Sequence, residues 1–378
     1  MFFISTASVS ASGQRPLLFM KKGSFPACLI ALPVALSCLT DAWADTSPPS
    51  TLLSLERIHD KEDLKEKRFE LKWLKDGDDY TFLKKTAQEK YKDSKEIWIA
   101  TATNPDDAKI IVSAEALVPD GSETPLEIDG YDFSPDRSLL LLFTNSERVW
   151  RRNSRGDYWV YDLQVKTLKK LGGPKATPSS LMFAKLSPAG THVAYVREDH
   201  IHIESLTDHS IRTLTTSGNN QTFNGRFDWV YEEELGIRDG FRWSPDGKAI
   251  AYWQFDETGV RKQTLVDHTS ALYPRVLRFG YPKAGQKNSA CRIGVVEDET
   301  SETTWIQIPG DPREHYLARM DWAGTNNSDE LIIQQLNRAQ DTKVVMIAKR
   351  RGGQARTILT EKDPAWVIMH NDLHWTPD

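Results

Sequence analysis

One turn motif recurs through the chain and constrains its fold more than any other feature. Each copy has an aromatic or apolar residue followed by a short run rich in Ser, Pro, Asp and Gly. The copies span residues 71–77, 131–136, 185–190, 241–247, 320–324 and 373–378. Proline holds φ at about −65° and glycine accepts positive φ, so each run is predicted to reverse the chain.

Short runs with the alternation of strands follow these turns. The first runs span 138–144, 191–197, 248–255 and 330–336, and second runs span 157–163, 200–206 and 342–348. Several units close with a third run, at 166–168, 211–215 and 356–360. The period of two within each run excludes a helical solenoid. Three or four strands repeated every ~50–60 residues are typical of β-propeller blades.

The spacing of the motif predicts the number of blades. Its key aromatic or apolar positions are 73, 133, 186, 243, 322 and 375, and the last unit stops at its opening turn. We therefore predict an all-β propeller of four-stranded blades, with about five blades and the start of a sixth. The long interval after position 243 is predicted to hold an inserted loop at Phe279–Gly285. Because a propeller closes on itself to remove strand edges, we expect a partial propeller.

The first 44 residues have the pattern of a secretory signal peptide. Lys21 and Lys22 precede a short apolar run, 27–39, and Ala42-Trp43-Ala44 is a small-x-small cleavage site. The natural start is predicted to be Met20, with cleavage after Ala44 and a periplasmic or secreted product. A lipoprotein anchored through Cys38 is the less favoured alternative. The predicted organisation is a leader at 1–44, an N-terminal lead-in at 45–70 and the propeller at 71–378.

Cysteine usage in the mature chain is minimal. Cleavage after Ala44 would leave Cys291 alone, so no disulfide scaffold is available. Cys291 begins an apolar run that is predicted to be a strand. We therefore expect it to be a buried small hydrophobe rather than a cross-linker.

Charge and motif searches exclude several classes of function. With 48 basic and 53 acidic residues the net charge is −5, so nucleic acid is not an expected partner. No Gly-x-Ser-x-Gly or His-Glu-x-x-His motif occurs, so we assign no catalytic residue, no metal site and no cofactor. His200 with His202, and His370 with His374, are read as strand residues rather than metal ligands. Arg155–Asp157 is expected to be a turn.

An acidic segment between two predicted blades, Phe227–Leu235, is the one unusual stretch. One reading is a short solvated helix, capped by Asp228 and with its acidic residues near the positive end of the helix dipole. The other is a carboxylate cluster that binds a cation, since adjacent like charges repel unless a partner relieves them. Composition alone favours the solvated helix.

The residues around this segment resemble a known family. The run Asp228–Glu234, the turn 243–247 and the strand 251–256 closely resemble the N-terminal propeller of dipeptidyl peptidase IV, in the prolyl oligopeptidase family. Tyr281–Gly285, and Trp150-Arg151 followed by Tyr161-Asp162, match the same family, and the single mature Cys fits a bacterial type. The resemblance runs from about residue 55 to the end. It implies an eight-bladed propeller before an α/β-hydrolase domain with a Ser-Asp-His triad.

The resemblance also implies roles for individual residues. Glu233 and Glu234 would grip the protonated amino terminus of a peptide, and Arg151 would hold the carbonyl of the second substrate position. Glu232 would project elsewhere and serve structure, with Trp229 and Tyr231 as supports.

The expected function is therefore the N-terminal, substrate-gating part of a secreted serine dipeptidyl aminopeptidase. Such an enzyme releases dipeptides with Pro or Ala second. This chain would be truncated before the hydrolase domain and inactive alone, with a peptide and the missing domain as its partners. Family members are often homodimers. The alternative is a stand-alone peptide-binding module or a non-functional fragment.

Overall fold

The computed structural model describes residues 53–59, 69–75, 77–216, 219–371, 373 and 375. The predicted leader at 1–44 lies outside these residues, as do most of the lead-in and most of the last turn copy at 373–378. The chain divides into two units, 1–68 and 69–378. In the first unit the structure describes one short helix, α1 (Leu55–His59). The second unit contains the described sheets. No helix among the described residues is long and apolar enough to cross a membrane.

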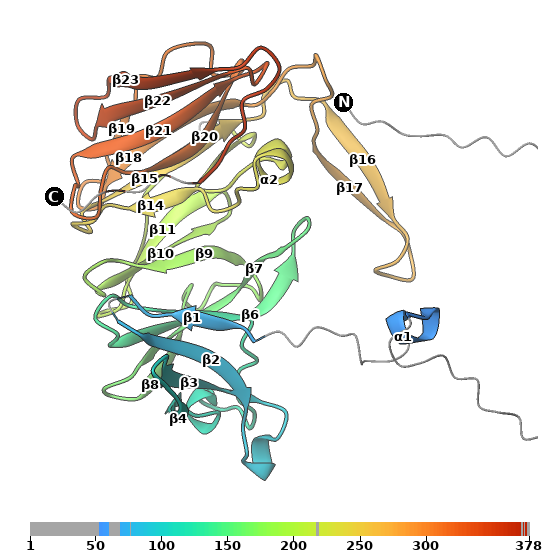
Figure 1. The fold of residues 1–378 in the computed structure, drawn as a ribbon, viewed down its shortest axis with the longest axis vertical. Coiled ribbons are helices and arrows are strands. Elements are labelled where there is room, and N and C mark those ends of the chain that lie inside the picture. The colour runs from blue at the N-terminus through green and yellow to red at the C-terminus, as the bar shows by residue number, and fades with distance from the viewer. Residues whose placement is uncertain are drawn as a thin grey trace, which may run out of the picture. The chain divides into compact units, whose positions relative to one another are not determined.

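Antiparallel sheets follow one another along the chain (Figure 1). The first sheet has the order β1-β2-β3-β4, with β1 (Leu71–Trp73), β2 (Asp79–Lys85), β3 (Lys95–Thr101) and β4 (Asn104–Val112). The second comprises β5 (Gly130–Phe133), β6 (Leu139–Arg148), β7 (Asn153–Asp162) and β8 (Thr167–Lys170). The third comprises β9 (Leu181–Leu186), β10 (His192–Arg197), β11 (His200–Ser205) and β12 (Ile211–Thr213). These two sheets are joined by pairing of β7 with β9.

The remaining sheets follow the same plan. The fourth comprises β13 (Thr222–Asn224), β14 (Phe241–Trp243), β15 (Ala249–Asp256), β18 (Ala290–Glu297) and β19 (Thr303–Trp305). The fifth has the order β20-β21-β22-β23, with β20 (His315–Trp322), β21 (Glu330–Asn337), β22 (Thr342–Lys349) and β23 (Ala355–Lys362). Short 3₁₀ turns occupy Glu89–Tyr91 and Glu115–Leu117. This succession confirms the predicted all-β propeller architecture.

The recurring turn lies at the same place in each sheet. Its key positions are the last residues of the five opening strands, namely Trp73, Phe133, Leu186, Trp243 and Trp322. In the Ser-Pro-Asp-Gly copy the Ser244 hydroxyl donates to Asp246 at 2.5 Å and accepts the backbone N–H of Ala249 at 2.9 Å. Gly247 takes φ of +67°. The side chains of the motif therefore close the turn and start the next strand.

Two local predictions are wrong. Phe279–Gly285 is not wholly a loop, because Phe279 and Gly280 end β17 (Arg275–Gly280). That strand pairs with β16 (Lys262–Asp267) in a separate hairpin, which projects from the sheets in Figure 1. Arg155–Asp157 is not a turn, because β7 begins at Asn153 and Gly156 pairs with Leu181 of β9. A side chain at Gly156 would meet the Phe143 ring, so the strand depends on this glycine.

The histidine pairs lie in different settings. His200 and His202 are both in β11, as predicted. His370 lies outside any strand, contrary to the prediction, because the chain leaves the fifth sheet after Lys362. His374 lies outside the described residues.

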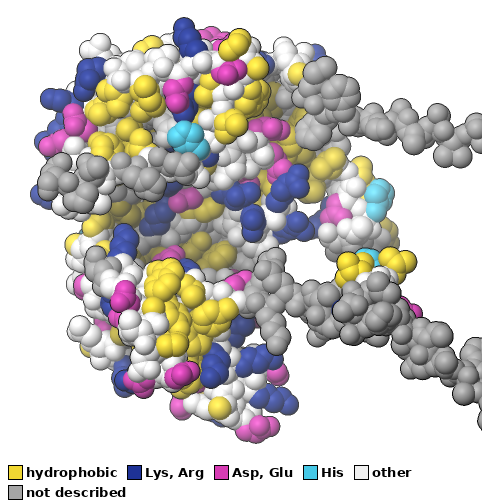
Figure 2. Space-filling view, in the orientation of Figure 1, with side chains coloured by type: hydrophobic (Ala, Val, Ile, Leu, Met, Phe, Trp, Pro, Cys, Tyr) yellow, Lys and Arg dark blue, Asp and Glu magenta, His cyan; other side chains and the backbone are white. Residues whose placement is uncertain are grey.

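Apolar side chains pack in clusters between neighbouring sheets. The largest cluster joins Trp253 and Phe255 of β15 to Leu317 of β20 and Met346 of β22, and it includes Cys291. The prediction that Cys291 is buried in a strand is therefore confirmed. Figure 2 shows apolar side chains also gathered on the surface over β1 and β2, where Phe69 and Trp73 are exposed.

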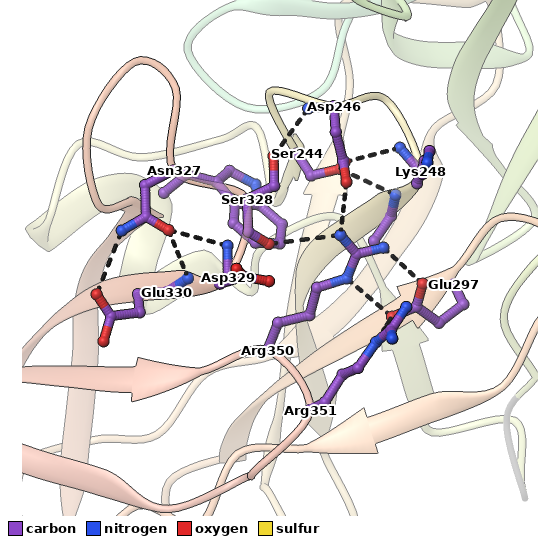
Figure 3. A network of polar contacts seen from close by, with 12 residues as sticks. Ser244, Asp246, Lys248, Glu297, Asn327, Ser328, Asp329, Glu330, Arg350 and Arg351 are labelled. Carbon is purple, nitrogen blue, oxygen red and sulfur yellow. Dashed lines mark hydrogen bonds and ion pairs between the residues drawn. The ribbon is translucent and has the colours of Figure 1, made fainter.

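A buried arginine links the fourth and fifth sheets (Figure 3). Arg350 follows β22, and its side chain is only 4% exposed. It donates to both Glu297 carboxylate oxygens, at 2.8 and 2.5 Å, and to Asp246 of the recurring turn at 3.0 Å. The bonds from Arg350 hold the pKa of Glu297 below its usual range. The network therefore ties the turn motif of one sheet to the next sheet.

We predict that Arg350→Ala lowers the free energy of unfolding by about 1.5–3 kcal/mol, because it removes the charge-assisted hydrogen bonds of a buried guanidinium to the partly exposed Glu297 and Asp246. The measurement is urea unfolding followed by circular dichroism. Arg351→Ala is the matched control, because Arg351 is 79% exposed and lies 3.7 Å from the same Glu297. It should cost less than about 1 kcal/mol. Equal losses in the two variants would contradict the assignment.

Candidate functional site

The acidic segment forms α2 (Trp229–Glu234), a helix inserted into a strand of the fourth sheet. Both β13 and β14 pair with the same strand, β15, so together they form one interrupted strand. Backbone bonds close the interruption at its base, with the N–H of Gly240 donating to the carbonyl of Gly225 at 3.0 Å. A side chain on Gly240 would lie 2.5 Å from the Gly225 backbone, so this close approach requires glycine. Residues 225–240 thus leave and rejoin an intact sheet.

The caps of α2 explain why six residues suffice for a helix. Asp228 is the N-cap, and its carboxylate accepts the backbone N–H of Tyr231 at 3.0 Å. The Ser289 hydroxyl donates to the other Asp228 oxygen at 2.8 Å. At the far end Gly236 takes φ of +66°, and the N–H groups of Leu235 and Ile237 donate to the Tyr231 carbonyl. The predicted Asp228 cap is confirmed.

One face of α2 is buried rather than solvated. The Tyr231 hydroxyl accepts the backbone N–H of Leu317 in β20 at 2.9 Å. Its ring stacks on Phe227 and meets the Phe255 ring edge-on, with centroids 5.5 and 4.8 Å away. Burial raises the pKa of the Tyr231 hydroxyl well above its usual value, so it stays neutral. Tyr231 therefore fixes the helix to both the fourth and fifth sheets.

The three consecutive glutamates have different surroundings. Glu232 is 4% exposed, and its nearest cation is Arg238, at 3.9 Å. Glu233 is partly buried and accepts a short bond from Nε of Arg151. Glu234 is exposed. The Glu232 side chain therefore points inward, whereas the side chains of Glu233 and Glu234 lie toward the surface.

Glu232 borders a cavity of about 510 Å³ among the second, third and fourth sheets. The cavity is also lined by Arg155, Arg197 and Arg226, and by apolar Phe227. Figure 2 shows acidic and basic side chains intermixed around the hollowed middle of the molecule. Burial raises the pKa of the Glu232 carboxyl to about 7, although Arg238 and Arg226 oppose the shift. At neutral pH this carboxyl is therefore part protonated.

Arg151 comes from the turn between β6 and β7, 82 residues before its partner Glu233. Its side chain is 75% exposed, whereas that of Glu233 is 10% exposed. The hydrogen bond and charge of Glu233 raise the pKa of the Arg151 guanidinium. The fold thus brings together two of the sequence-predicted site residues from separate sheets.

Aromatic side chains that lie near this pair in sequence pack against the end of the β16–β17 hairpin. The Trp229 centroid lies 4.2 Å from that of Tyr281, just after β17. The Trp150 centroid lies 4.5 Å from that of Phe279. Trp229, Trp150 and Tyr281 are among the residues that carry the family resemblance, whereas Phe279 is not. The apolar residues Val276, Leu277 and Phe279 indicate a strand, but no local pattern places Phe279 beside Trp150.

No group of three or more His, Cys, Asp or Glu side chains in the described ranges is arranged to hold a metal ion. The arrangement at α2 is instead an anionic surface beside one arginine. It can bind a cationic group at Glu233 and Glu234 and an acceptor oxygen at Arg151.

Comparison with known proteins identifies the family. Residues 134–378 match the model of the dipeptidyl peptidase IV N-terminal region. The chain belongs to this family. It is 31% identical over 256 residues to a probable dipeptidyl peptidase 4 of Aspergillus fumigatus, covering 66% of this chain and 32% of that protein. It is 27% identical over 247 residues to the inactive dipeptidyl peptidase 10 of Rattus norvegicus, covering 64% and 31%.

A solved structure has the same fold as this family member. The crystal structure of Porphyromonas gingivalis dipeptidyl peptidase 4 matches with a TM-score of 0.68 and 28% identity. The match covers 78% of this chain and 40% of that chain. The chain thus spans about a third of the length of the curated relatives that it matches.

We predict that Glu232 makes the fold less stable as the pH rises. Its folded pKa of about 7 lies above the ordinary value of 4.5, so the folded chain retains a proton that the unfolded chain has lost. Stability should therefore fall from about pH 4 to pH 7. Glu232→Gln should remove this loss and exceed the wild type at pH 8 by at most about 3 kcal/mol.

Urea unfolding at several pH values measures this effect. Glu234→Gln is the control, because Glu234 lies on the same helix but is exposed. It should keep the wild-type pH dependence. A Glu232→Gln variant whose stability follows the wild-type pH profile would contradict the assignment.

Proposed function

We propose that this propeller gates and binds substrate for a secreted serine dipeptidyl aminopeptidase that releases Xaa-Pro and Xaa-Ala dipeptides. Glu233 and Glu234 bind the free amino terminus of the peptide, and Arg151 binds the carbonyl of the second substrate position. The observation that carries the proposal is the contact of Arg151 with Glu233, beside an exposed Glu234. This contact brings together Arg151 and Glu233, two of the residues to which the family resemblance assigns substrate binding.

The charges suit this ligand. A peptide α-amino group has a pKa of about 8 and is largely cationic at neutral pH. Two carboxylates fixed on one helix favour that cation over an acylated terminus. Arg151 offers N–H donors to a carbonyl oxygen while its Nε remains bonded to Glu233. Because these groups fix the position of the amino terminus, they set how many residues separate it from the bond that is cleaved.

In this proposal the bond-breaking chemistry belongs to a Ser-Asp-His triad on a hydrolase domain beyond residue 378. The rival is a peptide-binding propeller that acts without that chemistry. One relative, from rat, is named an inactive dipeptidyl peptidase, which is a precedent for loss of activity in this family. The nucleotide sequence after the codon for Asp378 separates the two. A continuation that encodes a Gly-x-Ser-x-Gly elbow supports the peptidase, and unrelated sequence supports the rival.

The binding prediction is that the chain prefers a free-amine Ala-Pro peptide amide over its N-acetyl form. Glu233→Gln and Glu234→Gln should each raise the Kd of the free-amine peptide about 30-fold. Loss of one partner of a desolvated charge pair costs about 2–5 kcal/mol, and 1.4 kcal/mol is tenfold. Isothermal titration calorimetry measures both peptides.

Glu232→Gln is the matched control for this experiment, because it lies on the same helix and faces Arg238 instead. It should change the Kd much less than the other two substitutions. Arg151→Ala should weaken binding but keep the preference for a free amine. Equal affinity for the free and acetylated peptides would overturn the proposal.

We also propose that the β16–β17 hairpin binds a second copy of this chain. Four exposed residues form its apolar surface, Leu265, Val266, Val276 and Leu277. Val266 pairs with Val276 and Leu265 with Leu277, so both faces of the ribbon are apolar. An isolated two-stranded hairpin is marginally stable in water, and its free edges can pair with an identical strand. Self-association would cover both the apolar faces and these edges.

We predict that Val266→Asp with Val276→Asp converts a dimer to a monomer, because it places charges on the surface that association buries. Analytical ultracentrifugation at micromolar concentration measures this. Val165→Asp is the control, since Val165 is also exposed but lies in the turn before β8. A wild-type chain that sediments as a monomer would contradict the proposal.

For the location, we propose export with cleavage after Ala44, supported by the sequence of residues 20–44 alone. The burial of Cys291, the one cysteine after that point, leaves no exposed thiol in the described mature residues to oxidise. N-terminal sequencing of the protein recovered from the periplasm or medium tests the cleavage site.

A further inference from the structure

We infer that Phe279 and Tyr281, at the base of the β16–β17 hairpin, are positioning residues that hold Arg151 against Glu233. Only the expected effect on peptide binding rests on the proposed function. Its structural part concerns the ligand-free chain and stands apart from that function.

Four rings form a row that connects three segments of the chain. Trp150 comes from the turn after β6, Phe279 and Tyr281 from the end of β17, and Trp229 from the start of α2. Successive ring centroids lie 4.5 Å apart for Trp150 and Phe279, 6.1 Å for Phe279 and Tyr281, and 4.2 Å for Tyr281 and Trp229. These distances are those of ring pairs in direct contact.

Each end of this row lies next to one member of the ion pair. Trp150 directly precedes Arg151 in the chain. Trp229 is four residues before Glu233 on α2, and residues at that spacing share one face of a helix. The turn after β6 and the helix α2 are therefore linked twice, once through the four rings and once through the bond from Arg151 to Glu233.

The ion pair does not fix Arg151 by itself. The Arg151 side chain is 75% exposed, and exposed ion pairs contribute little to stability. Packing of Trp150 on Phe279 restrains the turn from which Arg151 extends. Loss of that packing would free the turn, although both charges would remain.

The hairpin base can serve as this support because its ladder is closed and it packs against Glu257, the residue that follows β15 of the fourth sheet. The backbone N–H of Tyr281 donates to the carbonyl of Arg261 at 2.9 Å. Gly280, between the two rings, is buried, and a side chain there would lie 2.6 Å from the Glu257 carboxylate. By contrast Tyr273, at the other end of the hairpin, is 79% exposed. The base is therefore the fixed part of the hairpin.

The first test uses the full chain without ligand. Trypsin cleavage after Arg151 or Arg152 is followed by mass spectrometry, relative to the other cleavage sites. Phe279→Ala and Tyr281→Ala should raise the rate at this turn about fivefold or more, with an unchanged melting temperature. Tyr273→Ala, an aromatic of the same hairpin, should leave the rate unchanged, and Tyr281→Phe should keep the wild-type rate. Equal rates in Phe279→Ala, Tyr281→Ala and Tyr273→Ala would overturn the inference.

The second test is a double-mutant cycle with the free-amine Ala-Pro peptide amide. Phe279→Ala should raise the Kd about fivefold in the wild type and have little further effect in an Arg151→Ala background. A merely structural role would give the same loss in both backgrounds and would overturn the inference. A wild-type chain without preference for a free amine would instead refute the proposed function, and trypsin cleavage would still decide the positioning.

Discussion

The pairing of β13 and β14 with the same edge of β15 is the constraint on which the site depends. Because the strand resumes in register, sixteen residues, 225–240, can leave the sheet without disturbing it. Gly240 makes this possible, because a side chain there would clash with the Gly225 backbone. A helix too short to be stable in isolation is then held by its caps and by Tyr231. Rigid strands thus position a polar segment that could not fold alone.

The helix divides three identical side chains among three environments. At 3.6 residues per turn, successive glutamates point about 100° apart. Glu232 faces the cavity and Arg238, Glu233 meets Arg151, and Glu234 is exposed. Burial therefore raises the pKa of Glu232, the glutamate that faces inward. The segment is a capped helix, as one reading of its sequence predicts, but one face of it is buried rather than solvated.

Local chemistry made most of the fold predictable from sequence. The turn motif carries its own hydrogen bonds, as at Ser244 and Asp246, so its copies marked the end of each opening strand. The cap at Asp228 was predictable for the same reason. What failed depends on contacts distant in sequence. Gly156 is in a strand because β9 pairs with it, and Phe279 lies beside Trp150, 129 residues away. No single segment contains those contacts.

The hairpin has a consequence for regulation through thermodynamic linkage. Its base touches the residues beside Arg151, while its apolar strands face solvent. A partner that binds these strands more tightly when the base is packed must also stabilise the packed base. The affinity at α2 and the affinity for that partner then change by the same factor. If that partner is a second copy of the chain, peptide affinity would depend on protein concentration.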